Sequence, residues 1–137
     1  MGAWSHEPFG NDTACDWAYE LEESQDFAVI EAAFDELLQA DDEYVDADIG
    51  SIAHAAAEVL AKALGQGTQT DAYTEKVDQW LARINQQVPP ALVQKAIKAL
   101  NLLRAEESEL NELWGETDEH DLWIENIEAL KDVFNGK

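Results

Sequence analysis

The sequence predicts an all-α protein, and three observations lead to that prediction. Apolar residues recur at intervals of three and four residues, the spacing of one face of a helix, in about six segments. No segment alternates apolar and polar residues as a half-buried strand does. With 137 residues, of which 46% are hydrophobic, the chain is long enough to bury a core without staples. We therefore expect one domain over residues 1–137, a compact bundle of about six helices.

The first two predicted helices follow residues that cap helices well. Asn11 and Asp12 precede a helix that runs to about residue 23, and Ser24 precedes the next one. Each helix presents one apolar side to the rest of the bundle. The side chains expected to face the core are Ala14, Trp17, Ala18 and Leu21 in the first helix, and Phe27, Ile30, Phe34, Leu37 and Leu38 in the second.

The third predicted helix is rich in alanine, which lets neighbouring helices approach closely. It begins at Asp46 or Asp48 and ends at Gly65, a residue suited to the left-handed position after a helix. His54 and Glu58 lie one turn apart on the side that we interpret as its outer face. That is the spacing of a pair of metal ligands, but two ligands do not make a site, so we interpret this face as solvated. The expected inward residues are Ile49, Ile52, Ala53, Ala56, Leu60 and Ala63.

The second half of the chain predicts three further helices. Thr70 or Asp71 caps the fourth, and the Pro89–Pro90 pair ends it and starts the fifth. Apolar residues then stay on one helical face from residue 90 to residue 114. This spacing predicts one long or kinked helix near residues 90–114, closed by Gly115. The last helix begins near Asp118. The expected inward residues are Tyr73, Val77, Trp80, Leu81 and Ile84 in the fourth helix, Leu92, Ala96, Leu103, Leu110 and Trp114 in the fifth, and Trp123, Ile127, Leu130 and Phe134 in the last.

The charge of the chain is strongly negative and unevenly distributed. It contains 30 acidic residues against 8 Lys and Arg, for a net charge of −22, and no Lys or Arg occurs before residue 62. Such a surface repels nucleic acid and anionic lipid, and it attracts basic proteins. We therefore expect a basic protein partner, no nucleic acid and no membrane. The acidic residues expected to contact that partner are Asp41, Asp42, Glu43, Asp46 and Asp48 in one loop, and Asp16, Glu20 and Glu23 on the first helix.

Motifs for catalysis and for cofactors are missing from the sequence. There is no phosphate-binding loop, dinucleotide fingerprint or nucleophile elbow. The single cysteine, Cys15, excludes an internal disulfide and a zinc site built on paired cysteines. The acidic loop over residues 40–48 lacks the glycine-centred pattern of an EF-hand, and we interpret His120 as a surface residue. We expect no catalytic, metal-binding or cofactor-binding residues in a cytoplasmic protein without a membrane span or secretion signal.

The first ten residues, which we call the leader, contain more aromatic and turn-forming residues than a frayed terminus usually has. Trp4 and Phe9 flank Pro8 immediately before the first cap, and such a hydrophobic residue can pack onto the first turns of the helix. Pro8 restricts the approach of the chain, and Gly10 allows a sharp turn. We expect both aromatic rings to fold back onto the bundle. A ligand pocket built on the same residues is the alternative.

Taken together, these segments resemble a bacterial family of domains of unknown function, number 4259. Members of that family open close to M-G-x-W-G-x-G-P-F-x-N-D, although Ser5 and Glu7 replace two of its glycines here. The resemblance continues through Tyr44 and Val45 into the alanine-rich helix. It implies a compact one-domain bacterial protein and brings no activity with it. The matching residues are Gly2, Trp4, Pro8, Phe9, Asn11 and Asp12 at the start, and Ser108, Glu109, Leu110, Glu112, Leu113, Trp114 and Trp123 near the end.

A binding protein is the function that these features favour, most concretely an immunity-type inhibitor that captures a basic toxin. A metal-dependent enzyme or metal-binding regulator that uses the acidic loop with His54 or His120 is a second possibility. A third is an interaction or structural domain whose acidity reflects adaptation to a saline cytoplasm, without a basic partner.

Overall fold

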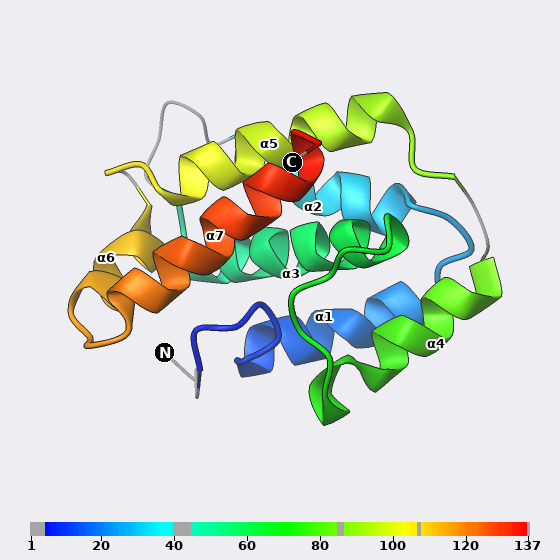
Figure 1. Cartoon of the computed structure of the whole chain (residues 1–137), viewed down its shortest axis with the longest axis horizontal. Coiled ribbons are helices and arrows are strands. Elements are labelled where there is room, and N and C mark those ends of the chain that lie inside the picture. Colours follow the sequence, from blue (N-terminus) through cyan, green and yellow to red (C-terminus); the bar gives the residue numbers. More distant parts are fainter. Residues whose placement is uncertain (1–4, 40–44, 85–86, 107, 137) are drawn as a thin grey trace.

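The computed structural model describes residues 5–39, 45–84, 87–106 and 108–136 (Figure 1). Within these ranges the chain forms α-helices, one short 3₁₀ turn and no strand, which confirms the predicted all-α class. None of the described helices is both long and apolar enough to cross a membrane. The helices are α1 (Asp12–Glu22), α2 (Ala28–Leu38), α3 (Ala47–Ala63), α4 (Glu75–Ile84, preceded by the 3₁₀ turn η1, Ala72–Thr74), α5 (Pro90–Leu103), α6 (Glu109–Gly115) and α7 (His120–Phe134).

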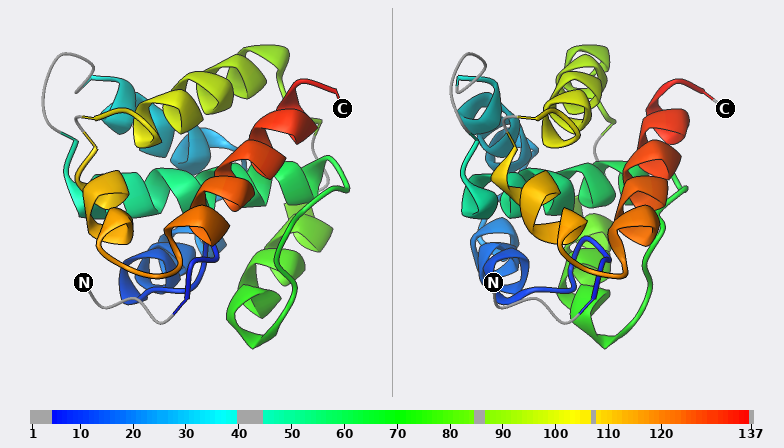
Figure 2. Two further views of the ribbon diagram at one scale, coloured as in Figure 1. Left: turned by 60° about the vertical axis from the view of Figure 1, so that its left-hand side comes forward. Right: turned by 90° about the vertical axis from the view of Figure 1, so that its left-hand side faces the viewer.

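Helix α3 is the centre of the fold. It contacts each of the other six α-helices among the described residues. Helices α2 and α5 lie on one side of it, α1 and α4 lie on the other, and α7 crosses over it (Figures 1 and 2). Its small alanine side chains permit this close approach on every side. Every residue from Ala53 to Ala61 is buried.

The burial of α3 contradicts the outer face that we predicted for it. His54 is 3% exposed and Glu58 is fully buried, so neither lies on a solvated surface. The physical reason is that other helices cover α3 on every side over residues 53–61, where the amphipathic pattern stops indicating which side is inward.

Helix boundaries that depend on local capping agree with the sequence. The side chains of Asn11, Asp46 and Asp71 each accept a hydrogen bond from a backbone N–H two or three residues further on. Gly65 follows α3 with φ of +81°, in the left-handed region that glycine tolerates. Ser24 differs from our prediction, because α2 begins only at Ala28. The Ser24 hydroxyl forms a tight turn with the backbone of residue 26 instead.

The predicted long helix near residues 90–114 is wrong, because the chain breaks between α5 and α6. Ser108 caps α6 through its side chain, and the Asn111 side chain donates to the carbonyl oxygens of Arg104 and Ala105 just after α5. These polar contacts stop the helix although the apolar phase continues across the break. Glu107, which lies on that apolar stripe, falls outside the described residues.

The prediction that Tyr73 faces the core, which rested on helical spacing, is also wrong. It is 50% exposed, whereas Val77 and Trp80 of the same predicted helix are buried. Tyr73 belongs to the 3₁₀ turn ahead of α4, so the α-helical spacing counted back from Val77 does not apply to it. The last helix buries all four residues predicted for it, Trp123, Ile127, Leu130 and Phe134.

Candidate functional site

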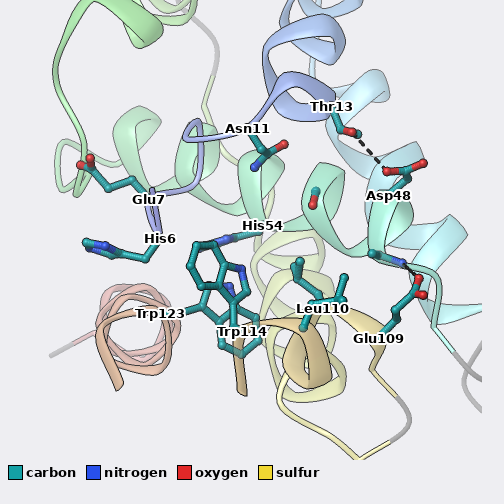
Figure 3. A pocket seen from close by; sticks show the side chains of 13 residues that line it. His6, Glu7, Asn11, Thr13, Asp48, His54, Glu109, Leu110, Trp114 and Trp123 are labelled. Atoms are coloured by element: carbon teal, nitrogen blue, oxygen red, sulfur yellow. Dashed lines mark hydrogen bonds between the residues drawn. The ribbon is translucent and has the colours of Figure 1, made fainter. Parts of the chain in front are cut away.

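A cavity of about 370 Å³ lies beside the N-terminal half of α3, where segments from both ends of the chain meet (Figure 3). Its volume falls within the range of small-molecule sites, about 300–1,000 Å³. The residues used below come from five segments: His6 and Glu7 of the leader, Asn11 and Thr13 at the start of α1, Asp48, Ser51 and His54 of α3, Glu109, Leu110 and Trp114 of α6, and Trp123 of α7.

The leader reaches the cavity because two contacts fix its course. The backbone N–H of Phe9 donates to Gln69 Oε1 at 2.9 Å, and both residues are buried. Gly10 closes a turn through hydrogen bonds with Ser5 and Glu7. A Cβ atom at position 10 would lie 2.7 Å from the Ser5 carbonyl oxygen, so the turn requires glycine there. Pro8 and Phe9 are buried, whereas Trp4 lies outside the described residues.

Glu58 holds the loop that carries Gln69. Its carboxylate is fully buried and accepts hydrogen bonds from the Thr68 backbone at 2.8 Å, the Thr68 hydroxyl at 2.6 Å and the Gln69 backbone at 2.9 Å. Burial raises the pKa of the Glu58 carboxyl, and the hydrogen bonds from Thr68 and Gln69 oppose that rise. Glu58 therefore anchors the loop, and the loop anchors the leader at Phe9.

His54 is connected to the same network and faces the cavity without a charge. Its Nε2 lies 2.6 Å from Asn126 Oδ1, and Asn126 Nδ2 donates to the Thr68 hydroxyl at 2.9 Å. Since the Asn126 nitrogen is used as a donor, its oxygen is the acceptor, which assigns the His54 proton to Nε2. Burial lowers the pKa of His54 to about 4, so the imidazole is neutral near pH 7.

Two indole rings form the apolar wall of the cavity. Trp114 is 6% exposed and Trp123 is fully buried, and Figure 3 shows them together next to His54 and Leu110. Trp123 stacks on His120, with ring centroids 6.1 Å apart and an interplanar angle of 14°. The enclosed Nε1 atom of Trp123 has no hydrogen-bond partner among the described residues.

His120 differs from the surface residue that we predicted. It is half-buried between α6 and α7, stacked on Trp123, and its Nε2 lies 2.8 Å from Asn111 Oδ1. The acidic sequence around His120 led to the wrong prediction, because its contacts are with Trp123, one turn further along α7, and with Asn111 on α6.

Three carboxylates border the cavity, Asp48 and Glu109 on the side away from the indoles and Glu7 beside His6 (Figure 3). Glu109 Oε1 accepts a hydrogen bond from the Ala47 backbone at 2.8 Å, which places this carboxylate at the start of α3. Asp48 accepts a hydrogen bond from the Thr13 hydroxyl at 3.2 Å and remains exposed. Glu7 adds a third carboxylate from the leader, and no Lys or Arg occurs among the described lining residues. The cavity thus combines negative charge with aromatic surface.

The structure brings part of the predicted contact set together. Asp16, Glu20 and Glu23 are exposed along α1, and Asp16 and Glu20 line a shallow hollow of about 240 Å³ with Thr13. Because Thr13 also bonds to Asp48, this α1 stripe is continuous with the rim of the cavity. Asp46 is exposed next to it and caps α3. The three remaining predicted contacts, Asp41, Asp42 and Glu43, lie outside the described residues.

The sequence did not lead us to predict that Glu109, Ser51 and His54 line one cavity. The available signal was the family resemblance, because the leader pattern and the S-E-L-x-E-L-W pattern lie about a hundred residues apart and both supply lining residues of this cavity. No group of three or more His, Cys, Asp or Glu side chains within the described ranges is arranged to hold a metal ion.

Comparison with known proteins yields one match. The model of a family described as "Domain of unknown function (DUF4259)" matches residues 2–126 of the chain, a range that includes all five segments of the cavity. No curated protein and no solved structure matches the chain.

Proposed function

We propose that this chain, which belongs to the DUF4259 family, is a small binding protein that captures a basic protein, most concretely as an immunity-type inhibitor of a basic toxin. The observation that supports this proposal is the distribution of charge in the folded molecule. Glu7, Asp48 and Glu109 at the cavity and Asp16, Glu20 and Glu23 along α1 form no ion pair among the described residues. Glu22, at the end of α1, lies 3.9 Å from Lys76, and Glu31, Asp35 and Glu128 on α2 and α7 are also paired.

The lysine and arginine side chains that form ion pairs within the described ranges lie away from the cavity. Lys95 lies 2.9 Å from Glu31 and 2.8 Å from Asp35, which joins α5 to α2. Arg104 lies 2.6 Å from Glu128, which joins the end of α5 to α7. No ion pair within the described ranges includes the residues that we call the anionic face: Asp16, Glu20, Glu23, Asp46 and Asp48.

This arrangement suits recognition of a positively charged protein surface. Exposed charges of one sign steer an oppositely charged partner toward the face that carries them and raise its association rate. They also repel one another, and a basic partner would relieve that repulsion. The attraction weakens with added salt, because the Debye length falls to about 10 Å at 0.1 M ionic strength.

Capture from an extract of the organism that encodes the protein tests the proposal. The bait is the wild-type chain or a triple variant, Asp16→Asn, Glu20→Gln and Glu23→Gln, which removes three charges without changing side-chain size. A matched control removes three exposed carboxylates on α2 and α7, with Glu36→Gln, Glu125→Gln and Asp132→Asn. We expect a basic protein that is retained at low salt, released at high salt, and retained at least tenfold less by the first triple variant than by the control.

Two results contradict the proposal. One is that the wild-type chain retains no basic protein even at low salt. The other is that both triple variants lose retention equally, since net charge alone, rather than the anionic face, would then account for the capture.

A further inference from the structure

We infer that the cavity beside α3 receives a guanidinium group, namely an arginine side chain, supplied by the captured protein or by a free arginine-like molecule. The inference rests on the proposed function and deepens it, because it names the chemical group that the site recognises. It follows from the charges that line the cavity, its aromatic wall, the unpaired indole N–H of Trp123 and the position of the cavity.

The lining selects for positive charge. Three carboxylates from three segments, Glu7, Asp48 and Glu109, border the cavity, and its described lining contains no Lys or Arg. His54, the most buried ionisable residue of the lining, is neutral and adds no repulsion. A cation entering here meets carboxylates that have no basic partner among the described residues.

The aromatic wall favours a guanidinium over an ammonium. Guanidinium is planar and weakly hydrated, stacks on aromatic faces and binds carboxylates through two parallel hydrogen bonds. An ammonium is compact and strongly hydrated, so it loses more on entering a partly enclosed site. The indole groups of Trp114 and Trp123 and the carboxylate of Glu109 border the same cavity, which brings both kinds of contact within one site.

The unpaired indole N–H of Trp123 points to a ligand that also carries a hydrogen-bond acceptor. Trp123 is fully buried and lines the cavity, yet its Nε1 has no partner among the described residues. An enclosed N–H without an acceptor is unfavourable, and a bound acceptor oxygen would relieve it once a small rotation of the indole turns Nε1 toward the cavity. An arginine residue within a peptide offers amide carbonyl oxygens close to its guanidinium, whereas a simple alkylguanidine offers none.

The position of the cavity connects this site to the anionic face. Asp48 belongs to both, and its bond to Thr13 joins the cavity rim to the α1 stripe. A basic protein that lies along α1 would therefore bring side chains to the cavity mouth. One arginine inserted there, surrounded by weaker contacts, is the usual arrangement of a protein interface, in which buried aromatic and arginine anchors dominate.

Titration calorimetry with small probes tests the inference. The probe is N-acetyl-arginine amide, and N-acetyl-citrulline amide is its uncharged isostere. Agmatine carries the guanidinium without the amide oxygens, and N-acetyl-lysine amide carries an ammonium instead. We expect the arginine amide to bind at least tenfold more tightly than the citrulline and lysine amides, and more tightly than agmatine.

Matched variants assign the binding to the cavity. Asp48→Asn with Glu109→Gln removes two carboxylate charges and keeps an acceptor oxygen at each position, so the bonds to Thr13 and Ala47 are retained. The control, Glu36→Gln with Asp132→Asn, makes the same change in net charge on α2 and α7. We expect the first pair to weaken arginine amide binding at least tenfold and the control to change it less than twofold.

The inference is overturned if arginine and citrulline amides bind equally, if neither binds at millimolar concentration, or if both variant pairs weaken binding alike. Its failure differs from failure of the proposed function. If the arginine amide does not bind while a basic protein is still captured through the anionic face, only the inference fails. If no basic protein is captured while the arginine amide binds, the cavity recognises a free molecule and the proposed function fails.

Discussion

Glu58 shows how a residue with the spacing of a metal ligand can have a structural task. Three donors from Thr68 and Gln69 surround its carboxylate, and Gln69 in turn fixes Phe9. The sequence places Glu58 one turn from His54, but only the folded chain shows that Asn126 and Thr68 lie between them. The pair is joined through polar groups that come from distant parts of the chain.

Replacing Glu58 with Gln tests this structural task. The variant keeps the size of the side chain but sets an amide NH₂ against backbone donors, so one buried donor loses its acceptor. We expect the free energy of unfolding to fall by about 1–3 kcal/mol, measured by urea denaturation. Glu75→Gln, at an exposed position on α4, serves as the control and should change stability by less than about 0.5 kcal/mol. Equal stability of the two variants would contradict the anchoring role.

His54 predicts a specific pH dependence of stability. Its pKa in the folded protein, about 4, lies below the ordinary value of 6.5, so the unfolded chain binds this proton more tightly. The contribution is complete above about pH 6.5 and is lost as the pH falls toward 4, which amounts to about 3 kcal/mol. A His54→Gln variant lacks this loss, while all carboxylates remain in both proteins and cancel in the comparison.

The measurement is urea denaturation of both proteins at several pH values from 7 to 4. We expect the wild-type chain to lose about 3 kcal/mol more than His54→Gln over that range. Identical pH profiles would show that the imidazole is not held neutral in the core.

At the scale of the elements, the sequence predicts best what is decided locally. Asn11, Asp46 and Asp71 cap their helices through bonds to residues two or three positions away, and such signals need no knowledge of the fold. The break before Ser108 and the burial of α3 depend on contacts with other elements. Apolar phase alone predicts one continuous helix in the first case and an outer face in the second, and both predictions are wrong.

For the candidate site too, the sequence predicts the local features but not the contacts between distant segments. The leader and the Glu109–Trp114 segment carry the family resemblance, so a sequence reader can single them out. That they meet at the start of α3, with Asp48 and His54 on the same cavity, depends on how α6 and the leader pack against α3. Neither spacing nor composition contains that information.

The leader itself is predicted to stabilise the bundle. Phe9 is fully buried, so Phe9→Ala should lower the free energy of unfolding by about 3–5 kcal/mol, as truncation of a core aromatic does. Leu122→Ala, at a position 44% exposed, is the control and should lower it by less than about 1 kcal/mol. Thermal denaturation compares them, and an unchanged melting temperature for Phe9→Ala would show that the leader does not contribute to the core.

At the scale of the whole molecule, the fold distributes the net charge of −22 unevenly over the surface. Lys95 and Arg104 hold helices together through ion pairs on α2 and α7, while the start of α1, the start of α3 and the cavity remain acidic. Charge in this arrangement acts at a distance on a partner. It therefore bears on the rate of encounter more than on the lifetime of a complex.

The rate at which the captured basic protein associates with the chain, measured at two salt concentrations, tests the central claim most directly. Between about 20 and 200 mM salt we expect the association rate constant to fall about tenfold or more, with a much smaller change in the dissociation rate constant. The same measurement on the Asp16→Asn, Glu20→Gln, Glu23→Gln variant should give a lower rate at low salt and a weaker salt dependence. An association rate constant that is independent of salt, or equal in both proteins, would contradict capture through the anionic face.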